Sequence, residues 1–167
     1  MTDNDSRLTK TKEQWARARR GGEEREVFYE GDERLPPGQH LVDTFPVLDL
    51  GFKPDIPIQE WKLSIGGFVA TPVTWTWEDF LAQPQCKDRS DFHCVTSWSR
   101  YDNDWEGVSF RQIMAVVKPL SLAKFVLFKS YDDYTTNLPI EACDDADVLL
   151  TYKWNHQPLT KEHGGPV

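Results

Sequence analysis

The chain has 167 residues, a formal net charge of −8 and many large apolar side chains, with seven tryptophans and nine phenylalanines. This length fits one domain with a hydrophobic core, and the acidic charge argues against a general nucleic-acid binder, because neutralising phosphates needs a basic face. No apolar run approaches the roughly 18 to 20 residues that span a bilayer, and the amino terminus lacks the apolar stretch of a secretory signal. We therefore expect a cytoplasmic protein that contacts neither nucleic acid nor membrane.

Residues 1–35 are predicted to form a polar N-terminal arm. The segment "TKEQWARARRGGEEREVF" is helical by propensity but weakly amphipathic, and "LPPGQH" interrupts any regular element after it. The domain itself is expected over residues 36–167. It begins with a proline-rich stretch, "LVDTFPVLDLGFKPDIPIQ", whose apolar residues are unevenly spaced and which we expect to be extended chain.

The next segments predict a strand followed by a short helix. Apolar and polar side chains alternate over residues 61–65, which is the period of a half-buried strand, and Gly66-Gly67 supplies a turn. Thr76 is placed to cap a helix, and Asp79 lies three residues later, as in a capping box.

The second half repeats this order. Ser109 is a candidate cap for a helix that Pro119 ends, with Gln112 three residues after the cap and three apolar residues facing inward, Ile113, Val116 and Val117. "AKFVLFKSY" predicts a buried strand. A brief helix, a strand over Val148 to Tyr152 and a turn at Asn155-His156 follow. Strands outnumber helices, so the predicted class is β-rich α+β, with mixed sheets and short helices.

The three cysteines, Cys86, Cys94 and Cys143, are odd in number and widely spaced. They include no CxxC pair, so neither a disulfide framework nor a zinc ribbon is indicated. Any special role must therefore belong to a single thiol.

Cys94 lies in "FHCVTSWSR", where hydroxyls and an arginine follow the thiol. A lone cysteine is most often a buried, inert side chain, but these polar neighbours suit a stabilised thiolate. His93 is a poor general base for it, because adjacent strand residues point to opposite faces, and the histidines show no zinc-ligand spacing. A thiolate that is the only protein ligand of a metal carried by an organic cofactor remains compatible with the residues.

The tail "HGGPV" has two readings. Two glycines before a proline are typical of a turn that needs positive φ, and they also allow the backbone to approach a ligand closely.

Three blocks of the sequence together resemble a known family. They are "FPVL" with the preceding Asp43, the cysteine block "HCVTSWSRYDNDWEGVS", and "YTTNLPIEACDDADVLLTYKWNHQPLTKEHGGPV". In this order they resemble the molybdopterin-binding domain of the sulfite oxidase superfamily, and more closely its stand-alone bacterial oxidoreductases. The resemblance runs from about residue 40 to the last residue and implies the fold of that domain.

The resemblance also implies site residues. Cys94 matches the cysteine whose thiolate ligates molybdenum, and Arg100 is a candidate catalytic cation facing substrate or phosphate. Ser130 stands where the family has a pterin-contacting threonine, and His163 matches a cofactor-contacting position before the glycine turn. The other expected cofactor contacts are Asp43, Pro46 and Val47.

The implied activity is two-electron oxygen-atom transfer to or from a small molecule, either reduction of an S-oxide or N-oxide or a sulfite-type oxidation. The expected cofactor is molybdenum-molybdopterin; no haem is expected, because no CxxCH motif occurs. Electrons would pass to or from an external electron-transfer partner. The alternative is a non-catalytic binding domain that keeps the fold without a bound metal.

The sequence departs from the family pattern after the last motif. The family continues with an arginine and further strands, whereas this sequence stops at Val167. We expect either that the C-terminal part of the family domain is missing or that the chain holds the cofactor weakly.

Overall fold

The computed structural model describes residues 34–47 and 53–167. The chain divides into two compact units, one of Met1–Phe45 with Phe92–Arg100 and one of Pro46–Asp91 with Tyr101–Val167. The helix expected within residues 11–28 lies outside the described residues, as does most of the arm, and the predicted domain boundary near residue 35 stays a prediction.

The first unit is built around one turn of a long hairpin. β4 (Gln85–Cys94) ends at Cys94, and β5 (Trp98–Ser109) starts four residues later and pairs with it. The short strand β1 (His40–Leu41) runs parallel to the start of β5, with His40 opposite Trp98. The sequence patterns predict no helix or strand over residues 85–109, so the structure adds this hairpin to the predicted elements.

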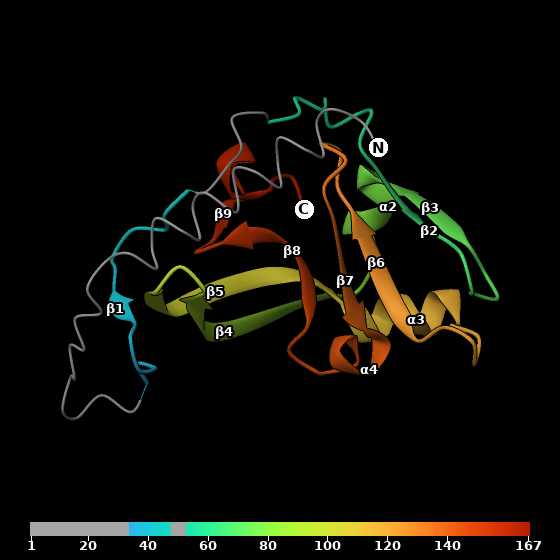
Figure 1. Cartoon of the computed structure of the whole chain (residues 1–167). Helices are drawn as coiled ribbons and strands as arrows, with labels where there is room; N and C mark the ends of the chain where they lie inside the picture. Colours follow the sequence, from blue (N-terminus) through green and yellow to red (C-terminus); the bar gives the residue numbers. More distant parts are fainter. Residues whose placement is uncertain (1–33, 48–52) are drawn as a thin grey trace, which may run out of the picture. The chain divides into compact units, whose positions relative to one another are not determined.

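The second unit contains the rest of the strands. β5 continues into it and pairs antiparallel with β8 (Leu149–Trp154), which in turn pairs with β9 (Gln157–Pro158). Two further antiparallel pairs are β2 (Lys62–Ile65) with β3 (Val73–Thr76), and β6 (Phe125–Lys129) with β7 (Thr135–Pro139). Figure 1 shows these pairs with the short helices α2 (Trp77–Leu81), α3 (Phe110–Val117) and α4 (Ile140–Cys143) and a 3₁₀ turn, η1 (Lys161–His163). The predicted β-rich α+β class is confirmed.

Aromatic rings dominate the core of the second unit. Trp61 lies edge-on to Trp77 with centroids 5.4 Å apart, and Phe80 contacts Tyr152 of β8 at 6.1 Å. Edge-to-face pairs add to the large apolar area that such rings bury. Val108 and Ile113 are fully enclosed beside them, which ties β5 and α3 to the same core.

The predicted capping box at α2 is present. Thr76 Oγ1 accepts a hydrogen bond from the Asp79 N–H (3.2 Å), and Asp79 Oδ2 accepts one from the Thr76 N–H (3.0 Å). The Thr76 N–H, together with the Thr76 hydroxyl, which also donates to Asp79 Oδ2 (3.0 Å), holds the pKa of the Asp79 carboxyl below its ordinary value. The alternation over residues 61–65 is also confirmed, because Lys62–Ile65 form β2.

Thr76→Ala should destabilise the chain by about 1 kcal/mol, the usual cost of losing an N-cap hydroxyl. The backbone N–H of residue 76, the larger cause of the lowered Asp79 pKa, is kept by alanine, and only the hydroxyl contribution is removed. That part of the loss should be present near neutral pH and shrink as Asp79 is protonated in acid. Urea unfolding at several pH values measures it. Thr71→Ala is the control, because the Thr71 N–H donates to the Val117 carbonyl (3.0 Å) and alanine keeps this backbone bond. Equal losses in both variants would show that the cap has no effect.

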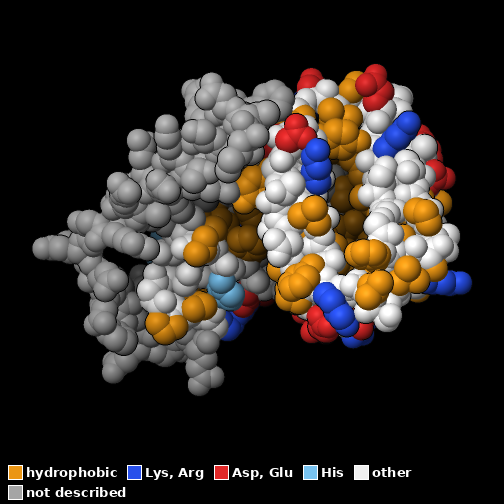
Figure 2. Space-filling view, turned by 45° about the vertical axis from the view of Figure 1, so that its right-hand side comes forward, with side chains coloured by type: hydrophobic (Ala, Val, Ile, Leu, Met, Phe, Trp, Pro, Cys, Tyr) orange, Lys and Arg blue, Asp and Glu red, His pale blue; other side chains and the backbone are white. Residues whose placement is uncertain are grey.

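The structure differs from three local predictions, which concern the cap of α3, the burial of β6 and the bounds of β8. Ser109 is the N-cap of α3 but its side chain makes no capping bond. β6 is not buried: Phe125 is 66% and Leu127 is 69% exposed, because only one face of this two-stranded pair meets the core. Figure 2 shows hydrophobic side chains at the surface of the described part. β8 begins one residue later than predicted and extends to Trp154 before the confirmed turn at Asn155-His156.

Candidate functional site

Cys94 is the last residue of β4 and is half-buried. The Thr96 hydroxyl, on a side chain only 4% exposed, donates to Cys94 Sγ at 3.2 Å. A hydroxyl that donates to sulfur stabilises negative charge on it. Cys94 Sγ therefore lies beside a hydroxyl donor, an arrangement that suits a metal-binding sulfur.

The turn after Cys94 is held by a small polar network. Gln39 Nε2 donates to the Cys94 carbonyl (3.0 Å), and the Ser99 hydroxyl donates to Gln39 Oε1 (3.2 Å). His93 Nδ1 lies 2.9 Å from the same Ser99 hydroxyl, and the His93 side chain is exposed. His93 is thus engaged with Ser99 rather than with the Cys94 thiol. Gln39 was missed because it is 55 residues from Cys94 in the sequence.

Two other predicted residues of the first unit lie together. Arg100 Nε donates to the Asp43 main-chain carbonyl at 3.2 Å. This bond ties the segment after β1 to β5, where Val42 N–H also donates to the Ser99 carbonyl (2.9 Å). Arg100 and Asp43 are therefore in contact. The role of Arg100 towards substrate and that of Asp43 towards the pterin stay predictions.

Trp98 provides the test of whether these residues fit a cofactor. Its ring stacks on Phe92 (5.3 Å) and meets Phe45 edge-on (5.3 Å), so it is 5% exposed. Among the described residues, Trp98 Nε1 is the one buried side-chain donor without a partner. An unmade bond of this kind costs about 1–3 kcal/mol, and a ligand rich in acceptor oxygens is the type of group that satisfies it. A soft sulfur ligand and an unused buried donor in the same unit fit a metal carried by a polar organic cofactor.

No group of three or more His, Cys, Asp or Glu side chains that could hold a metal ion occurs within 34–47 and 53–167.

Pro46, Val47, Ser130 and His163 belong to the second unit. Pro46 is half-buried and Val47 exposed. Ser130 lies in the β6–β7 turn, where its hydroxyl donates to Asp132 Oδ1 (2.5 Å) and holds the pKa of Asp132 below its ordinary value. These contacts explain the turn, and the pterin contact of Ser130 stays a prediction.

The glycines of the tail are needed by the backbone. Gly164 follows η1 with φ of 91°, a left-handed conformation that other residues adopt at a cost. A Cβ on Gly165 would lie 2.2 Å from the Leu159 carbonyl oxygen. His163, immediately before them, is half-buried, and its Nδ1 lies 3.1 Å from Thr160 Oγ1. The predicted turn is therefore confirmed, and it determines the position of His163.

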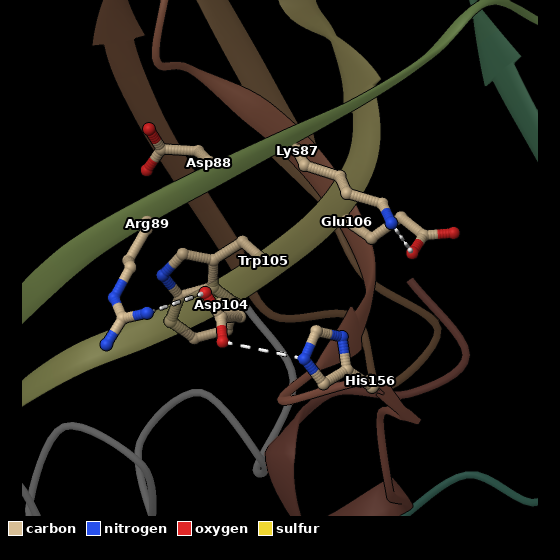
Figure 3. A pocket seen from close by; sticks show the side chains of 7 residues that line it. All are labelled: Lys87, Asp88, Arg89, Asp104, Trp105, Glu106 and His156. Carbon is tan, nitrogen blue, oxygen red and sulfur yellow. Dashed lines mark ion pairs between the residues drawn. The ribbon is translucent and has the colours of Figure 1, made fainter.

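A separate charged groove of about 200 Å³ lies in the second unit (Figure 3). Its charged side chains face one another: Lys87 Nζ lies 3.7 Å from Glu106, and both Arg89 (4.0 Å) and His156 (3.6 Å) approach Asp104. None of its residues is a predicted site residue. Its lining is Lys87, Asp88, Arg89, Asp104, Trp105, Glu106 and His156.

Glu106 at this groove should contribute to acid sensitivity. Hydrogen bonds from the Tyr152 hydroxyl (2.6 Å) and Lys153 Nζ (2.9 Å) lower the pKa of Glu106. A carboxyl with a lowered folded-state pKa stabilises the fold above its ordinary value, about 4.3, and this is lost as pH falls through the folded value. Glu106→Gln should therefore lower stability at pH 7 and flatten its fall in acid, measured by urea unfolding. Glu60→Gln, at an exposed site, is the control for removing one carboxylate. A wild-type profile for Glu106→Gln would contradict the prediction.

Within residues 34–47 and 53–167, no helix is long and apolar enough to cross a bilayer.

Comparison with solved structures shows the fold. The chain matches the sulfane dehydrogenase SoxCD from Paracoccus pantotrophus with a TM-score of 0.60 and 22% identity, over 68% of this chain and 34% of that chain.

Comparison with other sequences identifies relatives. The chain is 38% identical over 138 residues to the uncharacterized oxidoreductase YuiH of Bacillus subtilis (strain 168), covering 80% of this chain and 68% of that protein. It is 37% identical over 92 residues to the protein-methionine-sulfoxide reductase catalytic subunit MsrP of Campylobacter jejuni, covering 55% of this chain and 29% of the relative. The chain thus spans about two thirds of one relative and less than one third of the other.

The model of the oxidoreductase molybdopterin binding domain matches residues 51–167, well over half of the chain. That range contains Cys94, Ser130 and His163. The resemblance seen in the sequence motifs is confirmed: the chain belongs to the oxidoreductase molybdopterin-binding domain family of the sulfite oxidase type.

Proposed function

We propose that the chain holds a molybdenum cofactor through Cys94 and catalyses two-electron oxygen-atom transfer to or from a small substrate. Two observations carry the proposal: Thr96 donates to Cys94 Sγ in the turn after β4, and Trp98 Nε1, at the start of β5, is buried without an acceptor. Membership of a molybdopterin-binding oxidoreductase family supports the coarser activity.

When bound, the cofactor would supply a metal that exchanges electrons in pairs while an oxygen atom moves on or off the substrate. The chain's own part is to hold the Cys94 thiolate. Thr96 stabilises its charge, and Gln39 fixes the backbone that presents it. Ser130, His163, Asp43, Pro46 and Val47 remain the proposed pterin contacts.

The substrate is proposed to be a small sulfur or nitrogen compound. Removing oxygen from an S-oxide or N-oxide consumes two electrons and two protons and releases water; oxidising a sulfite-type anion is the same exchange in reverse. Arg100 is the proposed cation for an anionic or strongly dipolar substrate, because a guanidinium presents several donors in a fixed plane.

Either direction requires an external electron carrier. MsrP is named as a catalytic subunit, and YedZ1 of Azospira oryzae, 28% identical over 113 residues, as a reductase subunit. We propose that this chain likewise exchanges electrons with a separate partner, and that it does so in the cytoplasm.

The test is elemental analysis for molybdenum together with the fluorescence of the oxidised pterin released from the protein. The protein should be expressed in a host that makes the cofactor and purified under mild conditions. Stoichiometric molybdenum and pterin are expected. A well-folded protein that contains neither from such a host would refute the proposal and favour a non-catalytic binding domain.

A further inference from the structure

A buried amide occupies the middle of β5. Asn103 is 0% exposed and is one of the largest fully buried side chains among the described residues. Burying an amide is unfavourable unless its donor and acceptor both find partners. A fully enclosed asparagine in the polar stretch "YDNDW" therefore calls for a structural or functional explanation.

Both ends of this amide are engaged, and they bridge two strands. Asn103 Nδ2 donates to the Ser90 carbonyl of β4 at 3.2 Å. Trp154 Nε1, at the end of β8, donates to Asn103 Oδ1 at 2.9 Å. Because the indole has a single N–H, this bond fixes the rotation of the Trp154 side chain.

The Trp154 ring in turn packs against His163. The ring centroids are 6.1 Å apart with an interplanar angle of 46°. His163 Nδ1 also lies 3.1 Å from the Thr160 hydroxyl. The imidazole is thus confined by an indole that is itself held by a buried amide.

We propose that Asn103 is a positioning residue that acts through Trp154 to set the orientation of the His163 imidazole. The path runs from β5 to β8 to η1, with one hydrogen bond and one ring contact. Its significance for the cofactor rests on the proposed function, because His163 is a proposed cofactor contact. The positional coupling itself is a property of the chain without the cofactor.

The first test uses the cofactor-free protein. Asn103→Leu removes the amide and keeps a side chain of similar volume. Tyr152→Phe is the matched control, because it removes the hydrogen bond from the Tyr152 hydroxyl of β8 to Glu106. Nitrogen-15 NMR of the His163 imidazole, assigned by its loss in His163→Asn, reports its tautomer and surroundings. Asn103→Leu should shift these signals and speed hydrogen exchange at the Trp154 indole N–H. Tyr152→Phe should lower stability while leaving the signals in place.

The second test uses the loaded protein. Losing a direct partner of a metal ligand weakens metal affinity by roughly 10- to 100-fold, and we expect an effect at the lower end of this range for a residue that acts through a cofactor contact. Asn103→Leu should therefore release molybdenum at least about tenfold faster than Tyr152→Phe on dilution, measured by elemental analysis of the retained protein. Equal release rates in the two variants would contradict the proposal that Asn103 affects cofactor binding through His163.

If Asn103→Leu fails to fold, Trp154→Phe takes its place, because it keeps a ring and removes the N–H. Unchanged His163 signals in the folded variant would overturn the inference. If the wild-type protein carries no molybdenum, the proposed function falls. The NMR comparison still decides whether Asn103 positions His163, so the two failures are distinguishable.

Discussion

Cys94→Ser is expected to abolish molybdenum-dependent activity while leaving the fold intact. The loss should exceed the roughly 10- to 100-fold effect of removing a partner of a metal ligand, because the proposed ligand itself is removed. A serine oxygen is also a harder donor than the thiolate. Molybdenum content, pterin fluorescence and turnover of a sulfoxide with an artificial electron donor measure the effect.

Cys86→Ser is the matched control. Cys86 lies in the same strand β4 and is also half-buried, and its Sγ donates to the Gly107 carbonyl at 3.4 Å, a bond that serine can keep. This variant should keep both molybdenum and activity. If Cys94→Ser retained full molybdenum-dependent turnover, Cys94 would not be the ligand.

Gly107→Ala should have the largest effect on stability. A Cβ at this buried position would lie 2.1 Å from the Leu150 carbonyl oxygen and 2.8 Å from the Thr151 Cα. These are backbone atoms of β8, so the clash can be relieved only by moving a strand. Overpacking of this kind costs about 1–3 kcal/mol or more. Thermal and urea unfolding should show the loss.

Gly66→Ala provides the comparison for this loss. A Cβ at Gly66 meets nothing within 4 Å, so alanine there should be nearly neutral. If Gly107→Ala proved as stable as Gly66→Ala, β5 and β8 would not be as closely packed as the structure has them.

Short-range features of the fold could be predicted from the sequence. Thr76 and Asp79 are three residues apart, and each side chain accepts a hydrogen bond from the backbone N–H of the other residue. The capping box can therefore be predicted from the sequence alone. The β4–β5 hairpin was missed because charged residues on its strands obscure the alternation. The exposure of Phe125 and Leu127 was missed because an apolar run does not reveal that one face lacks a covering layer.

The same contrast holds for the candidate site: residues within short motifs could be predicted, and residues with distant partners could not. Cys94 and His163 were singled out because short motifs surround them. Gln39 and Asn103 were not, because their partners are far away in the sequence: 55 residues separate Gln39 from Cys94, and 51 separate Asn103 from Trp154. A buried asparagine between two aspartates has the same local sequence as a solvated loop, and only the pairing of β5 with its neighbours distinguishes them.

The apolar outer side of β6 also affects how the protein behaves in concentrated solution. Phe125 and Leu127 project from a two-stranded pair that has no further strand partner among the described residues, an arrangement prone to self-association. Each chain carries a net charge of −8, so two copies repel one another. Salt at about 0.1 M limits that repulsion to roughly 10 Å. Ionic strength should therefore set the balance between dispersed and associated chains.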